Sequence, residues 1–151
     1  MLRTRLNDAL KAAMKAKEEL SVSTLRLILA ALKDRDIAAR SKGNRDGIAE
    51  SELLSLLQSM IKQRRESIAA YEKGGRMDLA QQEAGEIAVI EGFLPAQMSE
   101  KEMAAAIDAV IAAVGATSLK DMGKAMAALK QQHAGKMDFG KASALVKARL
   151  S

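Results

Sequence analysis

The sequence predicts an all-α protein, and three features of its composition lead to that fold class. Of its 151 residues, 48% are hydrophobic but only 2% are aromatic, and 29 are alanine. Residues with β-branched side chains are few, and Pro95 is the single proline. Alanine and leucine favour helices, and proline interrupts them. We therefore expect helices that approach one another closely over small side chains.

Four helices are expected before Pro95, because apolar residues recur there at helical spacing. They should cover residues 2–18, a stretch capped by Ser21 or Ser23, residues 49–73 and residues 78–92. Residues 41–47 are polar and contain two glycines, which predicts a loop. Gly74 and Gly75 end the third helix, and the residue before Pro95 avoids helical geometry, which ends the fourth.

Three shorter helices are expected after Pro95. Their start and stop signals are the pair Ser99 and Glu102, then Gly115, Ser118 and Asp138. Helices of this length with short connections predict a three-helix bundle. We therefore divide the chain into a multihelical N-terminal domain, residues 1–95, and a small C-terminal three-helix tail domain, residues 96–151.

The net charge of +5 is confined to one end of the chain. Residues 117–151 contain seven basic and two acidic residues, whereas residues 1–116 contain 17 of each. A neutral body with a basic end is a common way to present a surface that binds polyanions. The competing interpretation is a solvated face, since lysines on helices usually contact water.

Several kinds of chemistry are not expected. The chain has no cysteine, and His133 is its single histidine, so neither thiolate chemistry nor a cysteine or multi-histidine metal site is predicted. We expect no cofactor, no metal and no catalytic residue. The acidic pair Glu83 and Glu86 is interpreted as part of a solvated helix face. The run Lys62-Gln63-Arg64-Arg65 is interpreted as a solvated or ion-paired face rather than a phosphate contact. No stretch has the roughly 20 apolar residues of a membrane span, and the N-terminus lacks a signal-peptide core, so we expect a cytoplasmic protein without a membrane partner.

Gly-Lys pairs occur three times in the basic end, with the glycines at 123, 135 and 140. They do not form a nucleotide-binding P-loop, because no strand and no glycine frame precede them. Gly123 lies inside a predicted helix, where glycine costs about 1 kcal/mol relative to alanine. Together with Ala127 it offers a groove of small residues, used either for packing inside the bundle, which we favour, or for close approach of a ligand.

The scarcity of aromatic residues restricts the type of nucleic acid that the basic end can bind. Proteins that read single strands stack bases on aromatic rings, and Phe139 is the one aromatic residue of this segment. We therefore expect a folded or double-helical polyanion, held by its backbone and shape.

Several motifs in the chain occur in an order that resembles the GatB/YqeY family. The motifs are Leu25-Arg26, Ile61-Lys62-Gln63-Arg64-Arg65-Glu66-Ser67, Gly75-Arg76-Met77-Asp78-Leu79-Ala80, Leu94-Pro95-Ala96-Gln97, Asp121-Met122-Gly123-Lys124-Ala125-Met126, Gly135-Lys136 and Leu145-Val146-Lys147. The chain is most similar to a free-standing YqeY-like protein. It departs from the family at Phe93, where tyrosine is usual, and at Ala127, where glycine is frequent.

This resemblance implies a role beside tRNA. In the family, the domain forms the tail of the B subunit of the tRNA-dependent amidotransferase and helps to hold tRNA, and related domains are appended to some glutaminyl-tRNA synthetases. A label of carbon–nitrogen ligase with glutamine as amido donor is expected to be inherited from the full enzyme. We therefore predict a non-catalytic tRNA-binding accessory protein. The predicted RNA-binding residues are Lys120, Gly123, Lys124, Lys136, Lys141 and Lys147.

Two other functions remain open at this point. One is a carbon–nitrogen ligase that acts within a larger complex. The other is a module that docks on an aminoacyl-tRNA synthetase or an amidotransferase subunit through its alanine-rich or methionine-rich faces.

Overall fold

The computed structural model describes all of residues 1–151, and every regular element in it is helical. The helices are α1 (Leu2–Ala16), α2 (Glu19–Ser41), α3 (Glu50–Lys73), α4 (Met77–Glu91), α5 (Glu100–Val114), α6 (Met122–Gln132) and α7 (Phe139–Leu150), with a 3₁₀ turn at Leu119–Asp121 before α6. The predicted all-α fold class is confirmed.

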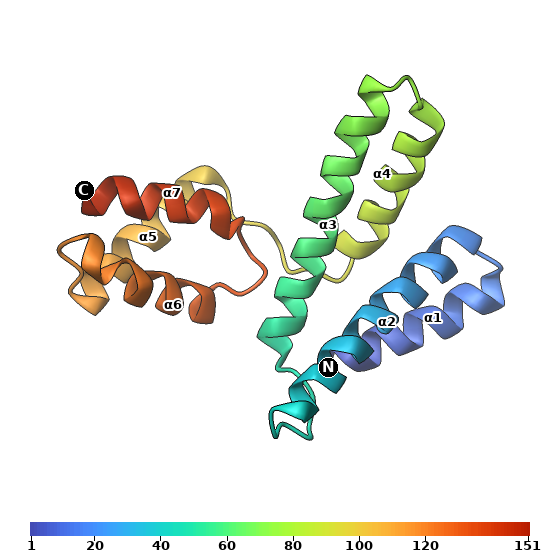
Figure 1. Ribbon diagram of the computed structural model, residues 1–151, viewed down its shortest axis with the longest axis horizontal. Coiled ribbons are helices and arrows are strands. Elements are labelled where there is room, and N and C mark those ends of the chain that lie inside the picture. Colours follow the sequence, from blue (N-terminus) through green and yellow to red (C-terminus); the bar gives the residue numbers. More distant parts are fainter. The chain divides into compact units, whose positions relative to one another are not determined.

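The chain forms two compact units, Met1–Leu94 and Pro95–Ser151. The first contains α1 to α4 and the second α5 to α7 (Figure 1). Each unit has a hydrophobic core of its own, and no buried residue belongs to both cores. The side chains of each unit therefore pack within that unit, independently of the other core.

The first unit is built from two helical hairpins, α1 with α2 and α3 with α4 (Figure 1). One stripe of each helix faces the shared core, whose most deeply buried members are Leu6, Leu25, Ile28, Leu53, Leu57 and Ile90. On α4, a Cβ atom at Gly85 would come within 2.7 Å of the Cδ2 atom of Leu20. Glycine at this position lets α2 and α4 approach closely.

The start of α2 differs from the prediction of a serine cap at Ser21 or Ser23. The helix begins at Glu19, and the Ser23 hydroxyl instead donates to the carbonyl oxygen of Leu20 at 3.1 Å. The reason is a tight reversal at Lys17, which has φ 58° and ψ 37°, the left-handed conformation. Because the chain turns there within two residues, the helix has already started before either serine is reached.

A polar clamp closes the other end of the α1–α2 hairpin. The Arg3 guanidinium donates to both oxygens of Asp36, at 2.6 and 2.8 Å, and also to the Ile48 carbonyl at 2.9 Å. The Ile48 N–H donates to Asp36 Oδ1 at 2.9 Å. A Cβ atom at Gly47 would lie 2.6 Å from that same oxygen, so only glycine allows the loop before α3 to pass this close. The clamp fixes where α3 begins.

The second unit follows the predicted start and stop signals except at Ser118, which begins the 3₁₀ turn, whereas the N-cap of α6 is Asp121. Ser99 Oγ accepts from the Glu102 N–H at 3.1 Å, and the Glu102 carboxylate accepts from the Ser99 N–H at 3.2 Å, which completes the predicted capping box. Gly115 ends α5 in the left-handed conformation, with φ 67°. The three helices bury a core formed by Met103, Ile107, Val110, Ala125, Leu129, Met137, Ala142, Val146 and Leu150.

No single helix is long and apolar enough to cross a membrane. By length and composition alone, one pair passes that test together, Glu100–Val114 with Leu119–Gln132, and it is bent by 97° at the break.

Truncation of Leu57 tests whether the two cores are independent. This side chain is fully buried, so Leu57→Ala should lower the free energy of unfolding of the first unit by about 2–5 kcal/mol. Residue-resolved hydrogen exchange should show faster opening of α1 to α4 and unchanged protection in α6. Ile107→Ala, at an equally buried site of the second unit, is the matched variant and should give the reverse pattern. Equal loss of protection in both units from either change would contradict separate cores.

The clamp predicts a dependence of stability on acid pH. Hydrogen bonds from Arg3, followed by the Ile48 N–H and the charges of Arg3 and Arg40, lower the pKa of Asp36 to about 2. Its carboxylate therefore stabilises the fold above about pH 4, and this contribution is lost as the pH falls towards 2. Asp36→Asn should destabilise the first unit by about 1 kcal/mol at pH 7, a value reduced for the partial exposure of the pair.

Urea denaturation at pH 7 and near pH 2 measures this effect. The difference in unfolding free energy between Asp36→Asn and the unmodified chain should shrink towards zero at the acid end. Asp34→Asn, an exposed carboxylate on the same helix, should leave the profile unchanged. A pH-independent cost for Asp36→Asn would show that the carboxylate charge is not what stabilises the clamp.

Candidate nucleic-acid interface

The predicted RNA-binding residues begin on the solvent side of α6. Lys120 lies in the 3₁₀ turn, and Gly123 and Lys124 lie in the first turn of α6. All three are exposed, whereas Ala125 and Leu129 on the opposite side of the helix are buried. The core stripe of α6 thus turns the predicted residues of this helix outward.

The start of α6 is held by Asp121. Its Oδ2 atom accepts hydrogen bonds from the N–H groups of Thr117 and Ser118, at 2.9 and 3.4 Å. These two donors, together with the charge of Lys124, lower the pKa of Asp121. The carboxylate therefore stays ionised and fixes the turn that carries Lys120.

Lys141 is positioned by the cap of α7. The Asp138 carboxylate accepts from the N–H groups of Gly140 and Lys141, at 2.8 and 3.3 Å, as expected for the predicted N-cap. Lys147 lies six residues further along the same helix, which places it about 120° away around the helix axis. Both lysines are exposed, but they project from different sides of α7.

Lys136 lies in the turn between α6 and α7, and this turn is anchored to the segment before α5. The Met98 N–H donates to the Lys136 carbonyl at 2.8 Å, and the Gln97 side chain donates to the Gly135 carbonyl at 2.7 Å. Gly135 has φ 73°, so it reverses the chain in the left-handed conformation. The Lys136 side chain is exposed and starts from a fixed backbone.

The predicted lysines fall into two groups at opposite ends of the α6–α7 hairpin. Helices α6 and α7 run antiparallel (Figure 1), so Lys120 and Lys124 at the start of α6 lie towards the end of α7 that carries Lys147. Lys136 and Lys141 lie at the turn. Lys124 lies about 12 Å from the end of α6 at Gln132, and Lys141 and Lys147 lie about 9 Å apart along α7. The structure therefore brings the residues onto one hairpin without joining them into a single cluster.

Two further cations of the basic end differ in what they contact. Arg149 forms a salt bridge with Asp108 on α5, which neutralises it within the unit. None of the five predicted lysines forms a salt bridge. Lys130, which is not among the predicted RNA-binding residues, is also exposed, and it lies on the same side of α6 as Gly123 because seven residues separate them. That spacing was the signal that could have identified it.

The structure contradicts the favoured interpretation that Gly123 packs inside the bundle. A Cβ atom at Gly123 would meet nothing within 4 Å, and Ala127 on the next turn is also exposed. The φ angle of Gly123 is not positive, so the backbone does not require glycine either. The small residues Gly123 and Ala127 of α6 therefore face open space.

The other charged groups singled out in the sequence have structural partners. Arg64 Nε lies 3.4 Å from a Glu86 oxygen and 3.8 Å from a Glu83 oxygen, at a site where all three side chains are largely buried. Burial, followed by the neighbouring Glu86, raises the pKa of Glu83. Arg65 pairs with Glu91 at 3.4 Å. These contacts join α3 to α4 and confirm that the run around Arg64 is ion-paired. The interpretation of Glu83 and Glu86 as a solvated face is wrong, because both carboxylates are largely buried beside Arg64.

Comparison with known proteins gives the same family for nearly the whole chain. A model of the Yqey-like protein family matches residues 3–150. Curated relatives are named "Altered inheritance of mitochondria protein 41, mitochondrial". The protein of Eremothecium gossypii is 35% identical over 108 residues, which cover 70% of this chain and 57% of the relative. Those of Kluyveromyces lactis and Saccharomyces cerevisiae strain YJM789 are 35% and 33% identical, over 58% and 59% of this chain.

The relatives also correct one expectation. This chain spans about half the length of these curated proteins, from 45% to 57% of them. Their names describe mitochondrial proteins, so the cytoplasmic location expected from the sequence is wrong.

Gly123→Ala separates a structural role of this glycine from a role in recognition. The methyl group meets open space and alanine favours the helix, so the substitution should stabilise the second unit by about 0.5 kcal/mol. Thermal unfolding followed by circular dichroism measures the change. Gly115→Ala is the matched variant and should destabilise, because that glycine has φ 67°. A loss of stability in Gly123→Ala would show that Gly123 packs inside the bundle after all.

Proposed function

Because the chain belongs to the YqeY-like family, we propose that its second unit binds structured RNA, with tRNA as the principal ligand, through the lysine side of α6 and α7. The observation that supports this proposal best is the state of the five lysines at 120, 124, 136, 141 and 147. All are exposed and none is in a salt bridge, although carboxylates are available in the same unit. Their charge is available to a polyanion.

The spacing of the lysines favours a large ligand over a small one. The groups at the two ends of the hairpin are about 9 to 12 Å apart along α6 and α7, so a free phosphate contacts one group at most. A folded RNA presents phosphates over the whole distance. Because each phosphate contact releases counterions, reaching both groups increases affinity and its dependence on salt together.

The composition of the surface favours recognition of backbone and shape. Phe139 is half-buried against the core of the second unit, and no other aromatic residue lies in α5 to α7. Bases therefore find no ring to stack on, and readers of single strands depend on such rings. Structured RNA, read through phosphates and 2′-hydroxyls, suits this surface better. The open surface at Gly123 and Ala127 supplies a place where a ribose-phosphate backbone can approach α6 closely.

The experiment is a titration of the full chain with total tRNA at about 50 and about 200 mM salt. About four phosphate contacts predict a slope near −3 in a plot of log affinity against log salt. The variant Lys120→Glu, Lys124→Glu, Lys141→Glu should lose affinity at least tenfold and reduce the steepness of the slope. Gly123→Ala should weaken binding while the fold becomes more stable.

The control carries the same change of net charge at other exposed lysines, as Lys62→Glu, Lys73→Glu, Lys101→Glu, and should retain most of the affinity. Affinity that ignores salt, or equal losses in the two triple variants, would contradict the proposed interface. Glutamine- and ATP-dependent amidation of mischarged tRNA, measured on the same preparations, addresses the carbon–nitrogen ligase alternative. We expect no turnover from this chain alone.

A further inference from the structure

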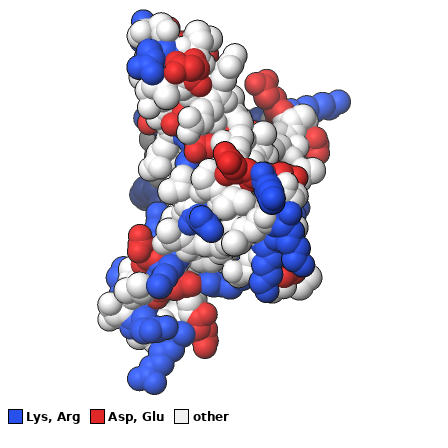
Figure 2. Space-filling model, turned by 90° about the vertical axis from the view of Figure 1, so that its right-hand side faces the viewer, with Lys and Arg blue, Asp and Glu red and all other residues white.

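The charges of residues 1–116 sum to zero, but the two helical hairpins of the first unit differ in the sign of their net charge. Residues 1–47, which form the α1–α2 hairpin and the loop after it, contain eleven basic and six acidic residues. Residues 48–94, which form α3 and α4, contain five basic and eight acidic residues. On the molecular face in Figure 2, basic side chains gather in several groups, with carboxylates close to many of them. The α1–α2 hairpin therefore carries a net positive charge outside the predicted RNA interface.

The outward face of α2 has the heptad pattern of a helix that packs against another helix. Seven residues separate Leu20 from Leu27, and seven separate Ala30 from Ile37. In a heptad that starts with Leu20 at position a, the a and d positions are Leu20, Ser23, Leu27, Ala30, Asp34 and Ile37, which we call the α2 seam. All six are exposed, with Leu27 and Ile37 at 49% and 52%, although Leu20 also lies against Gly85 of α4. The core stripe of α2 lies on the other side of the helix.

A line of positive charge runs along one edge of the α2 seam. The g positions of the same heptads are Arg26, Lys33 and Arg40, about 10 Å apart along the helix. All three are exposed and none forms a salt bridge, although Arg40 also contributes to the low pKa of Asp36. In coiled coils the g positions choose the partner through ion pairs with its charged e or g residues. This edge therefore complements a helix that carries carboxylates at heptad spacing.

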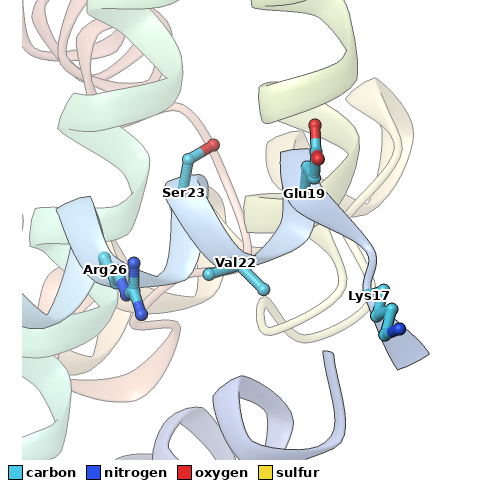
Figure 3. Close-up of a pocket in the computed structure, with 5 residues that line it drawn as sticks. All are labelled: Lys17, Glu19, Val22, Ser23 and Arg26. Carbon is cyan, nitrogen blue, oxygen red and sulfur yellow. The ribbon is translucent and has the colours of Figure 1, made fainter. Parts of the chain in front are cut away.

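The beginning of the α2 seam adjoins an open cavity of about 260 Å³. It is lined by Lys17, Glu19, Val22, Ser23 and Arg26, with Lys17 contributed by the end of α1 (Figure 3). The cavity thus joins one seam residue, Ser23, to one residue of the basic edge, Arg26. Lys17, which directly follows α1, adds a second cation to the lining, whereas Glu19 adds one carboxylate, so the charged side chains around the cavity sum to +1.

The side chains of the α2 seam and its edges also argue against three other ligands: a second copy of α2, a lipid surface and RNA. The e positions of α2 are Thr24, Ala31 and Ala38, so a second copy of α2 offers no carboxylate to the basic edge, and its own basic edge repels. A lipid surface is disfavoured because Asp34 lies in the middle of the narrow apolar face. RNA is disfavoured because its charged backbone gains nothing from contact with the apolar side chains of Leu27 and Ile37.

We propose that the α2 seam is a docking surface for an amphipathic helix of another protein. The apolar a and d residues of that helix pack on Leu27, Ala30 and Ile37, and its acidic residues pair with Arg26, Lys33 and Arg40. Asp34 selects a basic or polar residue at the facing position, which fixes the register of the two helices. This surface belongs to the first unit and does not depend on RNA binding by the second.

Two designed three-heptad peptides serve as probes. Both carry leucine at a and d, one has glutamate at e and g, and the other has lysine there, so repulsion keeps each peptide from self-association. Fluorescence anisotropy of labelled peptide measures affinity for the full chain. The acidic peptide should bind at least tenfold more tightly than the basic one. The variant Arg26→Glu, Lys33→Glu, Arg40→Glu should reverse this preference, and Leu27→Ser, Ile37→Ser should abolish binding of both peptides.

The controls separate docking from general charge attraction. Lys62→Glu, Lys73→Glu, Lys101→Glu changes the net charge equally and should leave the preference for the acidic peptide intact. All substituted positions are exposed, so circular dichroism should show unaltered helix content. Equal affinity for the two peptides, binding that survives Leu27→Ser, Ile37→Ser, or an equal effect of the two triple variants would overturn the proposal.

Two further ligands complete the test. Vesicles of phosphatidylcholine and phosphatidylserine, mixed about three to one, and total tRNA are titrated with the same variants. Neither ligand should respond to Leu27→Ser, Ile37→Ser. Loss of vesicle binding in that variant, with no discrimination between the peptides, would assign the surface to lipid and overturn the proposal.

Discussion

Each helix of this chain buries a single stripe of side chains. The residues that remain exposed on the opposite side determine which ligands the helix can bind. With few aromatic residues available, the two cores are filled by leucine, isoleucine, valine, methionine and alanine at helical spacing. This packing fixes the rotation of every helix about its axis. Because Ala125 and Leu129 must face inward, Lys124 must face outward, and because Leu25 and Ile28 face inward, Leu27 remains in solvent.

The charged residues divide into those that hold the fold and those that remain available. Arg3 and Asp36 close a loop, and Arg64 with Glu86 joins α3 to α4. Such partly buried charges need partners, because removing an ion from water costs more than a surface pair returns. The exposed lysines of α6 and α7 face no such requirement and form no salt bridge. A cation that forms no salt bridge within the fold can bind an anionic group of a ligand without breaking a contact that stabilises the protein.

Local signals were predictable from the sequence because a few neighbouring residues determine them. The capping box of Ser99 and Glu102, the stop at Gly115 and the cap at Asp138 each involve groups within four residues. The start of α2 was missed because a lysine, Lys17, adopts the left-handed conformation that usually indicates glycine. No composition rule places a helix start immediately after such a residue.

The rest required the tertiary structure. Arg3 and Asp36 are 33 residues apart, and nothing in either local sequence indicates the other. The spacing of Gly123 and Ala127 in the sequence does not show what surrounds Gly123. Two small residues on one side of a helix suit packing against another helix and binding of a ligand equally well. Only the position of the neighbouring helices shows that this side of α6 is open. The positive charge beside the α2 seam was not apparent from the sequence for a related reason. The charge sum over residues 1–116 cancels the basic α1–α2 hairpin against acidic residues further along the chain.

The two proposed surfaces lie on units with separate cores, and this separation has a thermodynamic consequence. A ligand on α6 and α7 changes affinity at α2 only if it changes the first unit as well, and no buried residue is shared between the cores. The two surfaces are therefore expected to act as independent sites on one chain. If the helix that docks on α2 belongs to a protein that also holds RNA, the second contact becomes intramolecular. Overall affinity then rises through effective concentration, without any new contact within this chain.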